Sequence, residues 1–170
     1  FDRAREYCLR AIERRSDRAI FWIQLGSIEM LRNELDAATT AFARAVELDP
    51  RSADALRGMA QVAARQGRYQ QALDLYTRAM QASPDDWQPH YDVGRLLYSL
   101  RQWDKAAHSF HEAAVRNPTS AMVHNNLATA LVKLRRLDEA LTHFRRAVEL
   151  DPQLTDARDN LRKLERHMAR

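Results

Sequence analysis

The histidines at positions 108 and 111 are the first candidates for chemistry in this 170-residue chain. They lie in the sequence HSFHE, where Glu112 directly follows the second histidine. A helical zinc-protease site needs two histidines four residues apart, with the catalytic glutamate between them. The spacing in HSFHE does not fit that pattern, and no third ligand is evident in the sequence. We therefore expect His108 and His111 to lie on the solvated face of a helix, without a metal.

Other residues that often carry catalysis also have simpler explanations here. His90 and His124 are 34 residues apart, and we expect both to pack between helices. The pair Asp85 and Asp86 is typical of a turn followed by a helix cap. With four glycines in all, the chain has neither a phosphate-binding loop nor a nucleophile turn. The sequence therefore predicts a protein that is not an enzyme, with no catalytic residue, cofactor or metal.

A 34-residue period organises the whole chain. The sequence RAVELDP occurs at residues 44–50 and again at residues 146–152. Four prolines share this period: Pro50, Pro84, Pro118 and Pro152. Upstream of each proline, an alanine, an aromatic residue and a second alanine recur at the same interval, beginning with Ala38, Phe42 and Ala45. Self-similarity at a fixed period of this length is the signature of a repeat protein.

These residues resemble the tetratricopeptide repeat (TPR) family, which has the same period and a Trp, Leu, Gly, Tyr, Ala, Phe and Pro pattern. Residues 19–52 fit well, whereas Glu29 and Ala63 replace the usual tyrosine of the pattern. The glycine that ends the first helix is kept only at Gly67, and the residues that replace it are Asn33, Arg101 and Arg135. The resemblance predicts a second helix of an incomplete repeat at 1–18, repeats at 19–52, 53–86, 87–120 and 121–154, and a C-terminal capping helix at 155–170.

The fold implied by the resemblance is all-α: a right-handed superhelical solenoid of antiparallel helix pairs. Apolar residues recur at spacings of three and four in each half of a repeat, which predicts two helices that each bury one face. Proline ends the second helix because it lacks an N–H group and disfavours helix in the residue before it. We expect Ser52, Asp86 and Ser120 to cap the helices that follow. We expect nine helices in all, from the unpaired second helix through four pairs to the end helix.

The two ends of the sequence differ in character. The chain begins inside a second helix, so we expect further repeats upstream in the parent protein. Phe1, Tyr7 and Ile12 would then lack their cover, which predicts self-association through this end, because large exposed apolar patches bind partners. The helix at 155–170 instead carries charged residues where a following repeat would pack, as a terminal repeat requires.

In TPR arrays the first helices line a concave groove, and that groove takes an extended or helical peptide. Arginine can hold a carboxylate with two hydrogen bonds, and tyrosine supplies rigid contact area. The alternative for the tyrosines is ordinary packing, and for the arginines a solvated face. We expect a protein or peptide partner, acidic and partly apolar, that binds at these groove residues: Ile23, Met30, Arg57, Gln61, Arg65, Tyr91, Arg95, Tyr98, Asn125, Asn126, Thr129 and Lys133.

Two specialised TPR sites do not match the sequence. Co-chaperone domains hold a C-terminal carboxylate with a lysine and two asparagines, followed by a lysine and an arginine. Arg57 stands in the first lysine position, but the other four positions hold Gln61, Asp92, Met122 and Asn126. O-linked N-acetylglucosamine transferases carry a ladder of asparagines along the groove, of which only Asn126 and Asn160 have counterparts here.

Other functions are also compatible with a helical-repeat chain or can be set aside from its sequence. In one alternative the chain is the substrate-recruiting arm of a larger enzyme, of glycosyltransferase or sulfotransferase type, whose catalytic domain lies outside residues 1–170. RNA binding would need a base-reading pair in every repeat, and no pair recurs. A net charge of +4 is too small to indicate nucleic acid or a membrane surface, and no apolar run is long enough to span a membrane. The single cysteine, Cys8, cannot form an internal disulfide, so the compartment stays unknown, with the cytoplasm favoured.

Overall fold

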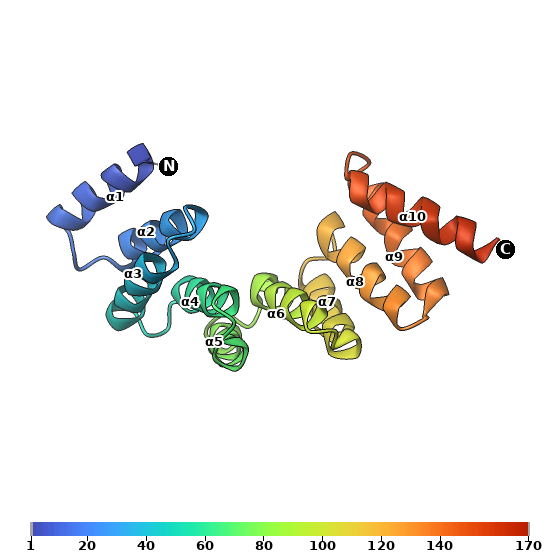
Figure 1. Ribbon diagram of the computed structural model, residues 1–170, viewed down its shortest axis with the longest axis horizontal. Helices are drawn as coiled ribbons and strands as arrows, with labels where there is room; N and C mark the ends of the chain where they lie inside the picture. The colour runs from blue at the N-terminus through green and yellow to red at the C-terminus, as the bar shows by residue number, and fades with distance from the viewer. Residues whose placement is uncertain (1, 170) are drawn as a thin grey trace. The chain divides into compact units, whose positions relative to one another are not determined.

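The computed structural model describes residues 2–169, which form ten helices and no β-strand (Figure 1). The predicted all-α helical-repeat fold is confirmed. The expected number of nine helices was wrong, because one unpaired helix, four pairs and an end helix add up to ten. No helix in the described part of the chain combines the length and apolar character needed to cross a membrane. The helices are α1 (Asp2–Arg14), α2 (Ala19–Leu31), α3 (Leu35–Leu48), α4 (Ala53–Arg65), α5 (Tyr69–Ala82), α6 (Trp87–Ser99), α7 (Trp103–Arg116), α8 (Ala121–Lys133), α9 (Leu137–Leu150) and α10 (Thr155–Met168).

Side-chain caps begin three of the first helices. The side-chain oxygens of Ser52, Asp86 and Ser120 accept hydrogen bonds from backbone N–H groups at the starts of α4, α6 and α8, at 3.3, 2.9 and 3.4 Å. These bonds satisfy N–H groups that have no partner within the helix. The three predicted caps are confirmed, and they set the points at which the first helices begin.

A left-handed residue ends the first helix of each pair. The φ angles are 63°, 76°, 58° and 63° at Asn33, Gly67, Arg101 and Arg135. The N–H of the next residue then donates to a carbonyl five residues earlier, as from Arg68 to Ala63 at 2.9 Å. This is the Schellman arrangement, which glycine adopts without strain. The prediction that three other residues replace the helix-ending glycine is confirmed.

Glycines bring the helices close enough to enclose an aromatic ring. Phe42 of α3 is 1% exposed and lies against Gly26 of α2 and Gly58 of α4. A Cβ atom built on Gly58 would lie 2.2 Å from the Phe42 ring. Phe110 of α7 lies in the same way against Gly94 of α6, where the corresponding distance is 2.6 Å. A larger residue at these positions would therefore separate the helices.

The helices form two compact units, which meet in the sequence between Pro84 and Asp85. In the first unit, α1 packs on α2, α2 on α3, α3 on α4 and α4 on α5, and α2 also contacts α4. In the second unit, α6 packs on α7, α7 on α8, α8 on α9 and α9 on α10, and α8 also contacts α6 and α10. The first helices of the pairs thus lie side by side within each unit. We call the surface that they form the inner face of the unit, and the surface formed by the second helices its outer face.

A partly buried ion pair, between the half-exposed Arg5 and the buried Glu29, joins α1 to α2. Glu29, which replaces the tyrosine of the TPR pattern, is 3% exposed, and its Oε1 lies 2.5 Å from Nε of Arg5. Its other carboxylate oxygen lies 3.6 Å from Nε of Arg32. Tyr7 of α1 is 69% exposed, but Ile12 is buried, so the expectation that Ile12 lacks cover was wrong. The α2 helix provides the cover, because Ile12 belongs to a cluster that includes α2 residues, while Phe1 lies outside the described residues.

The last helix, α10, has one buried face and one polar face. Its Ala157 and Leu164 are buried where α10 packs on α8 and α9. Arg162 and Glu165 are exposed, and Glu165 accepts a hydrogen bond from Arg145 of α9 at 3.2 Å. The expected polar surface of the end helix is therefore present.

Candidate peptide-binding faces

The twelve residues predicted to line a groove fall on two inner faces. The inner face of the first unit holds Ile23, Met30, Arg57, Gln61 and Arg65, from α2 and α4. The inner face of the second unit holds Tyr91, Arg95, Tyr98, Asn125, Asn126, Thr129 and Lys133, from α6 and α8. Each face has its own chemistry.

On the first inner face, most of the predicted residues are engaged within the unit. Ile23 and Met30 are half-buried and pack against the cluster of Ala38, Phe42 and Val62. Arg65 donates from Nη1 to the backbone carbonyl of Met30 at 2.8 Å, which joins α4 to α2. Nη2 of Arg57 lies 3.4 Å from the carboxylate of Asp54. The apolar entrance expected at Ile23 and Met30 is therefore partly core, and both arginines already have partners.

On the second inner face, a chain of hydrogen bonds runs from α10 through α8 to α6. Asn160 donates to Oδ1 of Asn125 at 3.1 Å, and Asn125 donates to Oδ1 of Asn126 at 3.2 Å. Asn126 in turn donates to the hydroxyl oxygen of Tyr91 at 2.8 Å. Tyr91 and Asn125 are each 8% exposed, so these bonds satisfy polar groups that are mostly shielded from water. We call these four residues the amide chain.

Aromatic rings hold two cations of this face in place. The guanidinium of Arg95 lies 5.9 Å from the centre of the Tyr91 ring, and Nζ of Lys133 lies 5.8 Å from the centre of the Trp103 ring. The Tyr98 ring packs against the same tryptophan at 4.9 Å. Burial raises the pKa of Tyr91 and of Tyr98 above its ordinary value, so both hydroxyls stay protonated at neutral pH. The rings attract the cations but leave their charge uncompensated.

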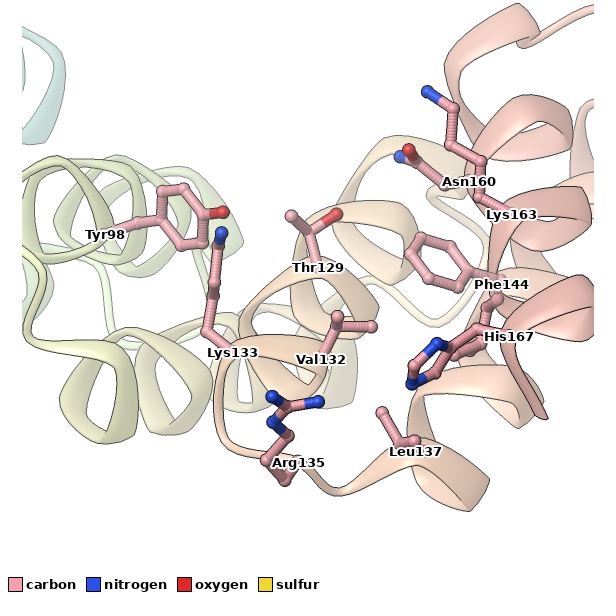
Figure 2. Close-up of a pocket in the computed structure, with 11 residues that line it drawn as sticks. Tyr98, Thr129, Val132, Lys133, Arg135, Leu137, Phe144, Asn160, Lys163 and His167 are labelled. Carbon is pink, nitrogen blue, oxygen red and sulfur yellow. The ribbon is translucent and has the colours of Figure 1, made fainter. Parts of the chain in front are cut away.

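Figure 2 shows an open pocket, with a volume of about 380 Å³, among α6, α8, α9 and α10 of the second unit. Four apolar side chains form its floor: Val132, Leu137, Phe144 and Leu164. Seven polar or charged side chains surround them: Tyr98, Thr129, Lys133, Arg135, Asn160, Lys163 and His167. We call this the basic pocket, because no acidic side chain of the described residues lines it. A smaller pocket of about 190 Å³ shares Tyr98 and Thr129 with it and adds Arg95, Phe110 and Asn126.

Sequence reasoning found three residues of the basic pocket and missed the others. The predicted ones are Tyr98, Thr129 and Lys133, and the missed polar ones are Arg135, Asn160, Lys163 and His167. The 34-residue period was the signal that could have found three of the four. It places Asn160, Lys163 and His167 in the positions that Asn126, Thr129 and Lys133 hold one repeat earlier. They were missed because the helix at 155–170 was considered only as a cap.

The outer face of the second unit gathers histidines in another pocket, of about 450 Å³, which His108, His111 and His143 help to line. Among the described residues, no three potential ligands are arranged to hold a metal ion. Nδ1 of His124 lies 3.1 Å from Nδ1 of His143, and Nε2 of His124 lies 3.0 Å from the carbonyl oxygen of Pro118. Because that carbonyl can only accept, Nε2 of His124 carries a proton; when the His124 ring is neutral, its Nδ1 is therefore the acceptor toward His143. Burial, with smaller effects of His124 and His111, lowers the pKa of His143.

Comparisons with known proteins connect these features to a family. The family model described as the tetratricopeptide repeat matches residues 1–50, 32–86 and 91–155. The protein CTR9 homolog of Arabidopsis thaliana is 33% identical over 90 residues, which cover 52% of this chain and 8% of that protein. The chain spans 8% or less of the length of each curated relative that it matches.

Two solved structures share the fold at higher coverage. YrrB, described as a TPR protein with an unusual peptide-binding site, has a TM-score of 0.74 and 28% identity, over 98% of this chain and 86% of YrrB. The first TPR of Spaghetti (RPAP3), solved with the HSP90 peptide SRMEEVD, has a TM-score of 0.67 and 25% identity, over 72% of this chain and 97% of that one. The repeat period, the helix pairs and the family match over nearly the whole sequence lead to one conclusion: this chain belongs to the tetratricopeptide repeat family.

Proposed function

We propose that residues 1–170 form a non-catalytic protein-interaction module that binds a peptide segment on its inner faces. The amide chain of the second unit carries this proposal. An asparagine side chain can make four hydrogen bonds, and Asn125 and Asn126 each use two of them within the amide chain. Asn126 is only half-buried, so its remaining donor and acceptor suit the backbone of an extended peptide. Because the amide chain holds them in place before binding, a ligand loses less free energy in ordering them.

The comparisons support this kind of ligand. YrrB has a peptide-binding site, and the Spaghetti domain was solved with a peptide that contains two glutamates and an aspartate. The uncompensated cations of the second inner face, Arg95 and Lys133, favour an acidic ligand here as well. The proposal concerns this chain alone. A role as the recruiting arm of a larger enzyme would require a catalytic domain outside residues 1–170, and the full-length reading frame tests that alternative.

A selection experiment followed by hydrogen exchange tests the proposed function. The 170-residue chain is used to select binders from a displayed library of random dodecapeptides. The enriched peptides are then added to the chain during hydrogen–deuterium exchange. We expect slower exchange on the first helices of the pairs, above all α6 and α8, and on the end helix α10, and little change on α7 and α9. Protection confined to the outer face, or a library from which nothing is enriched, would contradict the proposal.

We also propose that the α1 end of the chain promotes self-association. Tyr7 on α1 is 69% exposed and Leu31 at the end of α2 is 61% exposed, and both side chains could bury apolar surface against a second copy of the chain. Light scattering should then give a mass that rises with concentration, and Tyr7→Ser should lower it. A monomer at all concentrations would show that this surface does not bind a second copy.

A further inference from the structure

We propose that the basic pocket of the second unit binds a short peptide segment in which one large apolar side chain is flanked by carboxylates. This inference rests on the proposed function and names the ligand class and the place where it is read. It adds residues of α10 and of the turn before α9 to the binding site, none of which belongs to the groove predicted from the sequence.

Two of the three lysines of the chain lie at this pocket. Of 27 lysine and arginine residues only three are lysines: Lys105, Lys133 and Lys163. Lys133 and Lys163 both line the pocket, whereas Lys105 lies on α7 and is not among the lining residues. Both pocket lysines are exposed, and no carboxylate of residues 2–169 forms an ion pair with either of them. Figure 2 shows the two side chains on opposite sides of Thr129.

Two arginines elsewhere on the second unit have carboxylate partners within the chain. Arg136 has two hydrogen bonds to Glu139, at 2.6 Å each, and Arg145 bonds Glu165 at 3.2 Å. The third cation of the pocket, Arg135, has no such carboxylate partner in the described part of the chain, although Arg136 beside it does. The three cations at the pocket thus have no carboxylate partner within residues 2–169 and can pair with the carboxylates of a ligand.

The floor of the pocket specifies the apolar part of the ligand. Phe144 is 2% exposed and Leu164 is 5% exposed, and both line the pocket together with Val132 and Leu137. A volume of about 380 Å³ falls in the range of roughly 300–1,000 Å³ typical of ligand sites. One leucine-sized or phenylalanine-sized side chain can occupy such a floor and displace water from it.

The charges around the floor specify the rest of the ligand. A neutral apolar segment would take water away from Lys133, Lys163 and Arg135 without offering them an acceptor, which is costly for a cation. Carboxylates on either side of the apolar residue supply those acceptors. Thr129 and Asn160 lie between the lysines and can bond the backbone of the same segment. An acidic segment with an apolar centre is thus the ligand that satisfies floor and rim together.

The library selection described above is repeated with two variants to test this assignment. Lys133→Glu/Lys163→Glu reverses both pocket lysines, and Lys105→Glu is the matched control on another helix. All three side chains are exposed, so the circular dichroism spectrum should not change. Loss of the contact between Lys133 and the Trp103 ring should lower the stability of the double variant by no more than about 1 kcal/mol. The unaltered chain and the control should enrich peptides with Asp or Glu on both sides of one apolar residue. The double variant should lose this preference and bind the enriched peptide at least about tenfold more weakly.

Carbodiimide cross-linking locates the bound carboxylates directly. The reagent activates a carboxylate of the peptide, the lysine amine displaces the activated oxygen, and an amide bond forms while the reagent becomes a urea. Because the chain has only three lysines, tryptic mass spectrometry of the product is unambiguous. We expect the peptide on Lys133 or Lys163 and not on Lys105.

The outcomes separate this inference from the proposed function. If peptides are enriched without acidic residues, or if they bind the double variant as well as the unaltered chain, the pocket assignment is wrong and the interaction module stands. If no peptide is enriched, both are wrong. A fluorescein-labelled random RNA dodecamer is the final control. Tighter binding of this RNA than of any enriched peptide would assign the cations to phosphates and overturn the inference.

Discussion

Replacing Gly58 with alanine tests how tightly the first unit encloses the ring of Phe42. The added Cβ would lie 2.2 Å from Cε1, 2.5 Å from Cζ and 2.7 Å from Cδ1 of that ring. Carbon atoms in favourable contact lie about 3.5–4.0 Å apart, so the ring or α4 must move by more than about 1 Å. The ring has little room to do so, because Phe42 is 1% exposed and also lies against Gly26.

Two opposing effects determine how much Gly58→Ala changes the free energy of unfolding. Overfilling a packed core costs about 1–3 kcal/mol. Alanine is more favourable than glycine inside a helix by about 1 kcal/mol, which works in the opposite direction. A contact as short as 2.2 Å belongs at the upper end of the first range. We therefore expect Gly58→Ala to lower the free energy of unfolding by about 1–2 kcal/mol.

A double-mutant cycle with Phe42→Leu isolates the contact. The smaller side chain relieves the clash, so the loss in Gly58→Ala/Phe42→Leu should be smaller than the sum of the two single losses by about 1 kcal/mol or more. Urea unfolding followed by circular dichroism measures the free energies. Hydrogen exchange should show the loss of protection on α3 and α4, because repeats couple mainly to their neighbours.

The other helical glycines give a graded control. Cβ atoms built on Gly94 and Gly26 would lie 2.6 and 2.9 Å from the Phe110 and Phe42 rings, so both alanine variants should cost less than Gly58→Ala. If Gly58→Ala raised the urea midpoint, helix propensity would outweigh the contact and the packing argument would fail. The same conclusion would follow if Gly26→Ala were the most destabilising of the three.

Three further changes test other parts of the structure. Phe144→Ala should cost about 3–5 kcal/mol, and hydrogen exchange should rise in the second unit before the first. The pKa of His143 is lower in the folded chain than in the unfolded one, so the unfolded state takes up a proton first and stability falls as pH drops below about 6.5. His143→Gln should therefore reduce the difference between urea midpoints measured at high and low pH. Arg5→Ala should cost about 1–3 kcal/mol because it leaves the Glu29 carboxylate buried without its closest partner, and adding Glu29→Ala should recover part of the loss in thermal melts.

Local features of the fold could be predicted because each depends on a few neighbouring residues. Ser52 caps α4 through a bond to a residue three positions ahead. The left-handed turn at Arg101 could be located because Gly67 marks the same position one repeat earlier. The burial of Ile12 was missed because it depends on where α2 lies, and the sequence of α1 contains no information on that contact.

The candidate site was only partly predictable because it depends on contacts between helices. The period identified Asn126 and Asn160 as equivalent positions, but Asn125, which bonds both, breaks the equivalence. Asn125 can bond Asn160 because α8 and α10 lie close together, and the packing of the whole unit determines that distance. Likewise, Met30 lies at an inward position, yet its side chain packs on the core and its carbonyl binds Arg65. The period thus predicts which positions face inward, and only the packed structure shows which side chains remain free to bind.

Because only some inward-facing side chains are free to bind, the cations expected to contribute most to the affinity for an acidic ligand are not those predicted from the sequence. A cation that already has a partner gains little from a second one, because the ligand must compete with the first. Arg57 lies 3.4 Å from Asp54, and Arg95 is not among the residues that line the basic pocket, whereas both lysines line the pocket and have no carboxylate partner among the described residues. Arg57→Ala/Arg95→Ala should therefore weaken an enriched acidic peptide by less than about 1 kcal/mol in calorimetric titration. Lys133→Glu/Lys163→Glu should exceed that loss at the same ionic strength, because it removes two free cations and adds repulsion. A larger loss from the arginine pair would place the carboxylates of the ligand on the arginines first predicted from the sequence, and would leave the lysines as a solvated rim.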